Sequence, residues 1–499
     1  MSLRVDLSLR TEQVLLGGEV ALQTVLRNEG SAPVETASLF DNNQITNYVL
    51  SDAQDKTIAT LNHITRQHLL EKVEPRTEDF RLVTLGAGQQ ESRDDNLTRY
   101  HWFDRPGVFF VRALYRWKDQ HILSAPRRLE ILAAPLRSFD QQWGYHYGEK
   151  FALHSCWLAQ RQDGTAELFL RESLRFGPQV IQHNPSLGLL PPSAEPRVSF
   201  DRTLMAGGSV WLAWLDVDAS KVTALRTQGG KVAGQGQRHA LPITGLDWAA
   251  PPLRSENDNI TLFISGMEAG SGRRVMAIEL RPDGSEAQRA FVTPALGGAV
   301  FIQGVCDEDG GFHLFWLTGD THEIKHLPID LATLSPMGAP TTIWTAPSLL
   351  VGFFAPPVLT TDSFLSCAFT LADEHAIRLG IAWLQLDQQA NPLKVQEMVL
   401  PGPDTVLRTS GEMNPAGHLF VAVTTPRSVH YVNGALMQAR TLAAASELFP
   451  GSVAGLTINH RNDVFFVANR VPYGLWEPLV HRGTDEDITE TEDHDEPAS

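Results

Sequence analysis

A short motif recurs about every fifty residues across the last two thirds of this 499-residue chain. Each copy starts near a polar turn, such as Asn257-Asp258-Asn259, and continues into a run of apolar and aromatic residues. A fixed period in this range is typical of repeated strand-rich units, and units of this length form the blades of β-propellers. The apolar runs cover residues 154–159, 211–215, 261–264, 313–317, 364–369, 418–423 and 464–468.

The spacing of the copies predicts the number of blades and the extent of the repeated region. Aligning the fourth residue of each run gives successive gaps of 57, 50, 52, 51, 54 and 46 residues. Seven copies predict a seven-bladed β-propeller over residues 143–482, and ring closure between the first and last copies leaves six or eight blades open. A linker is expected near residues 133–142.

Residues 1–134 lack this period and show a β pattern of another kind. Residues 20–26 form a β-like run that ends in the turn Asn28-Glu29-Gly30. In residues 108–117 the period of two places five side chains on one face of a strand, namely Phe109, Val111, Ala113, Tyr115 and Trp117. One buried face of this kind predicts a β-sandwich, so we expect the whole chain to be all-β.

The first quarter of the chain also carries a resemblance to a known family. Its features are the Asn28-Glu29-Gly30 turn and two strand starts, at Ala87-Gly88 and at Pro106-Gly107. They resemble immunoglobulin-like modules of the bacterial intracellular proteinase-inhibitor type. Those modules have Pro-Gly where this chain has Ala87-Gly88, and Tyr where it has Phe109 or Phe110. The resemblance implies an immunoglobulin-like fold, and inhibitory activity is not carried over.

The repeated region resembles the sialidase-like and NHL-like propeller classes. Residues 307–316 show the shared shape, a polar turn that leads into a long apolar run. A sialidase Asp-box needs a Ser or Thr, an Asp, a Gly and an aromatic residue at fixed offsets, and the sequence has no clear copy. The resemblance therefore implies a fold and does not favour glycosidase activity.

Charge and composition limit the partners that the chain is expected to bind. The net charge is −17, and eight of the acids lie in the last fifteen residues, which leaves about −9 elsewhere. This acidity argues against nucleic acid as a partner, and residues 483–499 are expected to be a disordered acidic tail. No apolar run approaches the length of a membrane span, so we expect no membrane span and a cytoplasmic location. The three cysteines, Cys156, Cys306 and Cys367, are expected to be unpaired.

The sharpest match to a metal motif is His322-Glu323-Ile324-Lys325-His326, which fits HExxH. Pro328 and the turn before His322 leave no room for the helix that this motif requires. On a strand the two histidines lie about 13 Å apart, too far to share one metal ion. We interpret the match as coincidence and predict no metal and no cofactor. Helical segments are expected only near residues 55–78 and 441–448.

The sequence shows no catalytic constellation, since a G-x-S-x-G elbow and a phosphate-binding loop are both missing. Four tryptophans lie within the repeated apolar runs and are expected in the core: Trp157, Trp211, Trp214 and Trp316. Four others lie near turns or domain edges and are predicted to contact a partner: Trp102, Trp117, Trp143 and Trp476. The favoured function is a non-enzymatic scaffold that presents propeller rim loops to a protein. The alternative is a sialidase-like propeller that binds or hydrolyses a glycan.

Overall fold

The computed structural model describes residues 3–481 outside a set of gaps. The gaps are residues 41–45, 62–80, 100, 102, 104, 119, 135, 146–149, 177–178, 184–185, 192, 201–208, 229–230, 233–235, 256, 307–310, 319–321, 346–348, 360–364, 373–378, 387–391, 400–407, 414–417, 425–427, 434–437, 445–454, 459–463, 471–473 and 477–478. The described residues are all-β apart from one 3₁₀ turn, η2 (Leu97–Arg99). None of their helices is long and apolar enough to cross a membrane.

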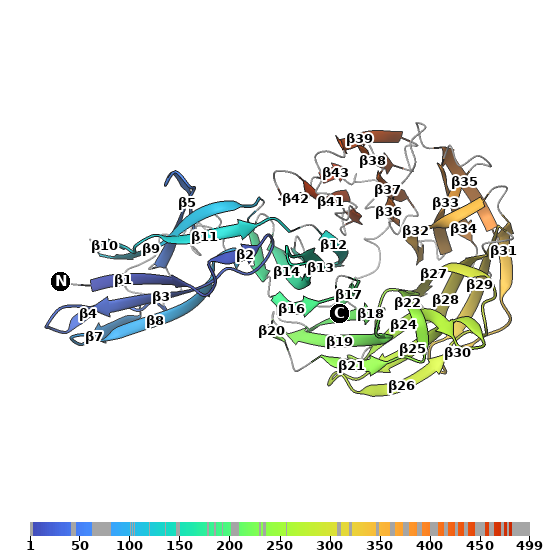
Figure 1. The fold of residues 1–499 in the computed structure, drawn as a ribbon, viewed down its shortest axis with the longest axis horizontal. Coiled ribbons are helices and arrows are strands. Elements are labelled where there is room, and N and C mark those ends of the chain that lie inside the picture. Colours follow the sequence, from blue (N-terminus) through green and yellow to red (C-terminus); the bar gives the residue numbers. More distant parts are fainter. Residues whose placement is uncertain are drawn as a thin grey trace, which may run out of the picture. The chain divides into compact units, whose positions relative to one another are not determined.

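The chain divides into two compact units. The first comprises Met1–Ala134 with Phe169–Gly188 and Pro472–Leu475, and the remaining residues form the second. Three sheets occupy residues 1–134 (Figure 1). One joins β1 (Leu3–Leu9), β3 (Ala21–Asn28) and β8 (Gln90–Asn96), and a small one joins β4 (Val34–Ala37) and β7 (Leu82–Leu85). The largest contains β2 (Gln13–Leu15), β11 (Arg127–Leu132), β9 (Gly107–Trp117), β5 (Thr46–Ser51), β6 (Thr57–Leu61) and β10 (Gln120–Leu123).

The alternation predicted for residues 108–117 is confirmed in β9. Phe109, Val111, Ala113 and Tyr115 are buried, and Trp117 at the end of the strand is partly exposed. The buried face of the largest sheet lies against the three-stranded sheet: the Tyr48 hydroxyl on β5 is 3.3 Å from the Thr24 hydroxyl on β3. The Tyr115 hydroxyl donates a hydrogen bond of 2.8 Å to the Ala37 carbonyl. Burial raises the pKa of Tyr115 to about 12.

In the described residues, seven small antiparallel sheets follow one another from residue 136 onward (Figure 1). We number them one to seven in chain order. The first holds β12 (Leu136–Tyr145), β13 (Lys150–Gln160), β14 (Ala166–Phe176), β15 (Gln179–His183) and β16 (Ser186–Leu190); the second holds β17 (Glu195–Phe200), β18 (Ser209–Asp216), β19 (Lys221–Gln228), β20 (Lys231–Val232) and β21 (Gln237–Ala240). The third holds β22 (Ile243–Trp248), β23 (Leu253–Arg254), β24 (Ile260–Glu268), β25 (Gly272–Leu280) and β26 (Glu286–Phe291).

The other four sheets repeat this plan. The fourth holds β27 (Ala299–Cys306), β28 (Gly311–Thr318), β29 (Glu323–Asp330), β30 (Ser335–Pro336) and β31 (Thr341–Thr345); the fifth holds β32 (Leu349–Leu359), β33 (Leu365–Ala372), β34 (Leu379–Leu386) and β35 (Pro392–Val399). The sixth holds β36 (Arg408–Met413), β37 (Leu419–Thr424), β38 (Ser428–Asn433) and β39 (Gln438–Ala444), and the seventh holds β40 (Gly455–Ile458), β41 (Val464–Arg470), β42 (Gly474–Trp476) and β43 (Leu479–His481).

The second, third and fourth sheets pack face to face, which is the propeller-like arrangement that the period predicts. One buried cluster joins the second and third sheets through Trp211, Trp248 and Met276. A second cluster joins the third and fourth sheets, where the rings of Phe263 and Phe312 stack with centroids 4.0 Å apart. The first strands of the first and second sheets, β12 and β17, contact each other. The first strands of the fourth to seventh sheets also contact one another in turn: β27 with β32, β32 with β36, and β36 with β40. Strand β40 of the last sheet also contacts β12 of the first.

The structure shows how far the tryptophans and cysteines of the repeated region are buried. The core prediction is confirmed for Trp157, Trp211 and Trp316, while Trp214 is partly exposed. Cys156 is buried and Cys306 is partly buried, and within the described residues neither forms a disulfide. The Cys367 side chain lies outside the described residues, as does the acidic tail over residues 483–499.

Two expectations about secondary structure were wrong. Residues 441–444, expected in a helix, are the end of β39, where they pair with β38. The expected helix near residues 55–78 contains the strand β6, and its remainder from residue 62 lies outside the described residues. Pairing with a neighbouring strand outweighs local helix propensity, because short helices are marginal without packing. The expected linker over residues 133–142 is also shorter, because β12 begins at Leu136.

Candidate functional site

The first strands of four sheets share an irregularity near their starts. In β12, β22 and β27 one extra residue interrupts the pairing with the next strand of the sheet, and in β32 the pairing is interrupted at three places, the first near its start. In β27, for example, Val300 pairs with Leu317 and Ile302 pairs with Trp316, which leaves Phe301 as the additional residue. Such bulges bend a strand and redirect a side chain, and they are common beside functional sites.

The bulges of β22 and β27 lie at the same end of the third and fourth sheets. Thr244 at the start of β22 pairs with Met267 at the end of β24, and Met267 pairs with Arg273 at the start of β25. The segment that leads to the fourth sheet comes back to this end of the third sheet, as the hydrogen bond of 2.8 Å from the Leu296 amide to the Arg273 carbonyl shows. The Ala299 amide at the start of β27 donates to the Leu296 carbonyl at 3.1 Å. The two sheets therefore present one continuous rim here.

Three apolar side chains on this rim are open to solvent. The exposed fractions are 46% for Met267, 38% for Val300 and 48% for Phe301. Phe301 also has a φ of 49°, in the left-handed region that residues with a Cβ seldom adopt. In the bulge of β22 the residue with positive φ is Gly245, at 58°, for which this conformation is unstrained. The fourth sheet thus holds an aromatic side chain toward water at a position suited to glycine.

Asp247 and Arg273 lie close together near this rim, because Asp247 pairs with Ser265, whose hydroxyl accepts from Arg273. Arg197 comes from the neighbouring second sheet. Burial raises the pKa of the Asp247 carboxyl, and the Trp248 amide, Arg197 on β17 and Arg273 on β25 oppose that rise. Solvent still reaches the Asp247 side chain, so the surrounding protein removes only part of its water. Arg273 donates to the Ser265 hydroxyl at 3.2 Å and Arg197 to the Pro196 carbonyl at 3.3 Å. We call Arg197, Asp247, Met267, Arg273, Val300 and Phe301 the rim site.

Two other polar networks join the second and third sheets. Asp258, with a φ of 64°, accepts from the guanidinium groups of Arg226 and Arg254, and its carbonyl accepts from the Trp211 indole at 3.1 Å. Arg226, Arg254 and Asp258 are each largely buried, so we interpret this network as structural.

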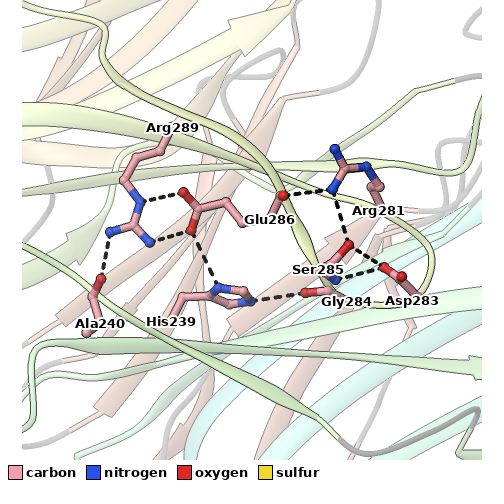
Figure 2. Close-up of polar contacts among 8 residues, drawn as sticks. All are labelled: His239, Ala240, Arg281, Asp283, Gly284, Ser285, Glu286 and Arg289. Carbon is pink, nitrogen blue, oxygen red and sulfur yellow. Dashed lines mark hydrogen bonds and ion pairs between the residues drawn. The ribbon is translucent and has the colours of Figure 1, made fainter.

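Figure 2 shows the second network, at the β25–β26 hairpin. His239 on β21 contacts the Gly284 carbonyl at 3.1 Å, and Arg289 donates to the Ala240 carbonyl at 2.7 Å. Arg289 also forms an ion pair with Glu286, which lies 3.6 Å from His239. Because these groups satisfy one another across the two sheets, this network too is interpreted as structural.

The HExxH segment lies in a strand context, as expected. His322 has a φ of 54° and lies directly before β29, which starts at Glu323. The imidazole of His326 instead forms a hydrogen bond with the imidazole of His313 on β28, with 2.9 Å between Nδ1 of His313 and Nε2 of His326. Burial, followed by the nearby His313, lowers the pKa of His326 to about 4. In the described part of the chain, no group of three or more potential metal ligands comes together.

The four tryptophans predicted as contact residues do not form the rim site. Trp117 is at the end of β9, partly exposed, with the Lys118 ammonium 5.3 Å from its ring centroid. Trp143 lies in β12 and Trp476 in β42, with side chains outside the described residues, and Trp102 is itself outside them. Their role in binding stays a prediction.

Sequence reasoning missed every member of the rim site. Two local signals were present: Asp247 interrupts an apolar run, and Val300-Phe301 follows Gly297-Gly298. Neither signal reveals that these segments meet at one rim, because that depends on how two sheets pack. The bulge that exposes Phe301 also follows from strand register and not from composition.

No family model matches the sequence, and no curated protein matches it. Among solved structures, the Dos1 propeller is 11% identical, with 70% of this chain and 85% of that chain covered at a TM-score of 0.40. A Hadza microbial sialidase, Hz136, is 10% identical, with 88% of this chain and 99% of that chain covered at a TM-score of 0.35. Hydrazine synthase of Kuenenia stuttgartiensis is 11% identical, with 70% of this chain and 97% of that chain covered at a TM-score of 0.40. The structure itself defines an all-β, propeller-like protein.

Proposed function

We propose that this chain is a non-enzymatic scaffold whose propeller presents the rim site to a protein partner. The observation that carries this function is the exposure of Met267, Val300 and Phe301 together at the rim of two adjacent sheets. Large apolar and aromatic side chains of this kind provide much of the energy of protein interfaces once they are desolvated. Phe301 is held outward although its backbone conformation is unfavourable, a pattern associated with functional positions.

We further propose a specific architecture for the scaffold. The seven sheets would be the blades of a seven-bladed propeller, supported by the contact between β40 and β12, which brings the last sheet to the first. Residues 1–134 would form an immunoglobulin-like β-sandwich that serves as a spacer or second contact module. The propeller would occupy residues 143–482 together with β12, and residues 483–499 would be the acidic tail. A cytoplasmic location and the exclusion of nucleic acid stay predictions.

Affinity capture from a native lysate tests the scaffold function. The full chain is compared with a double variant, Val300→Ser and Phe301→Ser, which removes two exposed apolar side chains of the rim site. We expect a specific protein to co-purify with the unmodified chain and to be lost from the double variant. Met337→Ser provides a matched control, because Met337 is 66% exposed and lies outside the rim site. Equal capture by all three chains would contradict a role for the rim.

A glycan-binding or glycan-hydrolysing propeller is the second candidate. Asp247 favours it, since a carboxyl of raised pKa near arginines is suited to proton transfer or to hydroxyl recognition. Glycosidases of the usual kind need two carboxyl groups, however, and the charged groups acting on Asp247 are both arginines. Release of fluorophore from methylumbelliferyl glycosides by the unmodified chain, with loss in Asp247→Asn, would favour this enzyme over the scaffold.

A further inference from the structure

The charges of the rim site converge without pairing with one another. Arg197 and Arg273 come from different sheets that meet at Asp247. Asp247 pairs with Ser265, whose hydroxyl accepts from Arg273, and the indole of the adjacent Trp248 donates at 2.9 Å to the Glu195 carbonyl, two residues before Arg197. Both arginines also act electrostatically on the carboxyl of Asp247. Within the described residues, however, neither guanidinium group forms an ion pair with it. Each arginine donates to one neutral oxygen, Pro196 O or Ser265 Oγ, and retains further N–H groups. Opposite charges held near each other and left unpaired leave donors available for a ligand.

The balance of charge at the rim favours an anionic ligand. Arg197 and Arg273 outweigh the single carboxylate of Asp247, while the nearby Glu268 and Arg274 neutralise each other at 2.9 Å. This small positive surplus stands out in a chain with a net charge of −17. Guanidinium groups bind carboxylates through two parallel hydrogen bonds, which is a strong and directional contact.

The apolar side chains beside these charges limit the kind of anion. Met267 is the cross-strand partner of Arg273, and Val300 and Phe301 begin the next sheet at the same rim. A free inorganic anion would leave all three apolar side chains in water. A peptide in an extended conformation places successive side chains about 3.3 Å apart along its axis, alternating between two faces. Such a segment reaches both the arginines and the apolar side chains.

We propose, on the basis of the protein-binding function above, that the rim site binds an extended segment of the partner protein in which an Asp or Glu lies within two residues of an aliphatic or aromatic residue. The carboxylate of that segment pairs with Arg197 and Arg273, and its apolar side chain packs on Met267, Val300 and Phe301. Asp247 opposes the incoming carboxylate and thereby restricts binding to segments that also bury apolar surface.

Selection from a phage-displayed library of random octapeptides on the full chain tests this preference. We expect enriched peptides to carry an acid within two residues of Leu, Ile, Val, Met or Phe. The affinity of an enriched peptide is then measured by fluorescence polarisation. Arg197→Gln and Arg273→Gln should each weaken it about tenfold or more, and Phe301→Ser by a similar factor. Arg238→Gln is the matched control, because Arg238 is exposed on β21 and does not belong to the rim site.

Asp247→Asn gives the most discriminating result. If the ligand is anionic, removing the carboxylate should strengthen peptide binding several-fold, whereas a ligand that is held by Asp247 would bind more weakly. Enrichment of peptides without acids, or arginine variants that bind like the unmodified chain, would overturn the proposal. If the lysate partner still depends on Val300 and Phe301 in that case, the scaffold function stands and only the acidic preference fails. If a sialylated glycan displaces the bound peptide, the rim site would instead be assigned to glycan binding, the second candidate function.

Discussion

At the scale of single residues, the structure places side chains where their local preferences are not met. Phe301 has a positive φ in a bulge, and His326 is buried beside a second imidazole. Neither position follows from composition, because each depends on the strand that pairs with it. In both cases the unfavourable free energy arises at one residue, so a single substitution measures its contribution to stability.

Phe301→Gly should raise the stability of the folded chain. The left-handed conformation costs about 1 kcal/mol or more for a residue with a Cβ, and glycine adopts it freely. The side chain that is lost is 48% exposed, so little buried apolar surface is lost with it. Chemical denaturation should show an increase in the free energy of unfolding of up to about 1 kcal/mol. Val300→Gly is the control in an extended segment, where a decrease is expected. A decrease in both variants would show that the bulge is not strained.

His326 should make stability depend on pH between about 6.5 and 4. Its pKa in the folded chain is about 4, below its usual value of 6.5, so the unfolded chain binds the proton more readily. Stability from this group is present above pH 6.5 and is lost as the pH falls toward 4, by about 3 kcal/mol in total. Urea midpoints of the unmodified chain and of His326→Asn should therefore converge as the pH is lowered. Parallel pH profiles would contradict the assignment.

At the scale of elements, two hairpins repeat one turn built on Arg-x-Asp-Gly and a hydroxyl residue. In each, the aspartate accepts from the amide and the hydroxyl two residues later, Thr165 in one case and Ser285 in the other. Gly164 and Gly284 have φ values of 84° and 83°. The Asp-Gly dipeptide predicts such a turn from sequence. Only the structure shows that the second turn contacts a neighbouring sheet (Figure 2).

These two glycines provide a matched pair of substitutions. Gly164→Ala should cost about 1–2 kcal/mol, because alanine resists the left-handed region and the added methyl group meets no neighbour. Gly284→Ala should cost more, since its methyl group would lie 3.1 Å from Cγ of Gln237 on the second sheet. Differential scanning calorimetry of both variants measures the difference. Equal losses would indicate that the hairpin tip is free to move away from Gln237.

At the scale of the whole molecule, the contact between β40 and β12 is the observation that bears on closure of the ring. In a closed ring each sheet is supported on both sides, so removal of the seventh sheet would expose the first and the sixth. A chain ending at residue 454 should therefore unfold at a lower temperature and with less cooperativity. A chain ending at residue 482 is the control, because it lacks only the acidic tail. Unchanged melting of the shorter chain would show that the sheets do not depend on closure.

Strand content and the repeat could be predicted from the amino-acid sequence. Alternation in residues 108–117 and the period of about fifty residues are local properties, so they are visible without coordinates. The prediction of a helix at residues 441–444 was wrong, because pairing with β38 overrides their helix propensity. The tryptophans predicted as contact residues were chosen because they lie near turns or domain edges, and their role in binding stays a prediction.

The residues of the rim site come together only through tertiary packing. Arg197, Asp247, Arg273 and Phe301 span about a hundred residues of sequence and come from the second, third and fourth sheets. Their proximity depends on the order and packing of those sheets, and the exposure of Phe301 depends on one extra residue in the pairing of β27 with β28. A periodic sequence specifies the repeating unit, whereas a site between units is specified by the register and packing that join them.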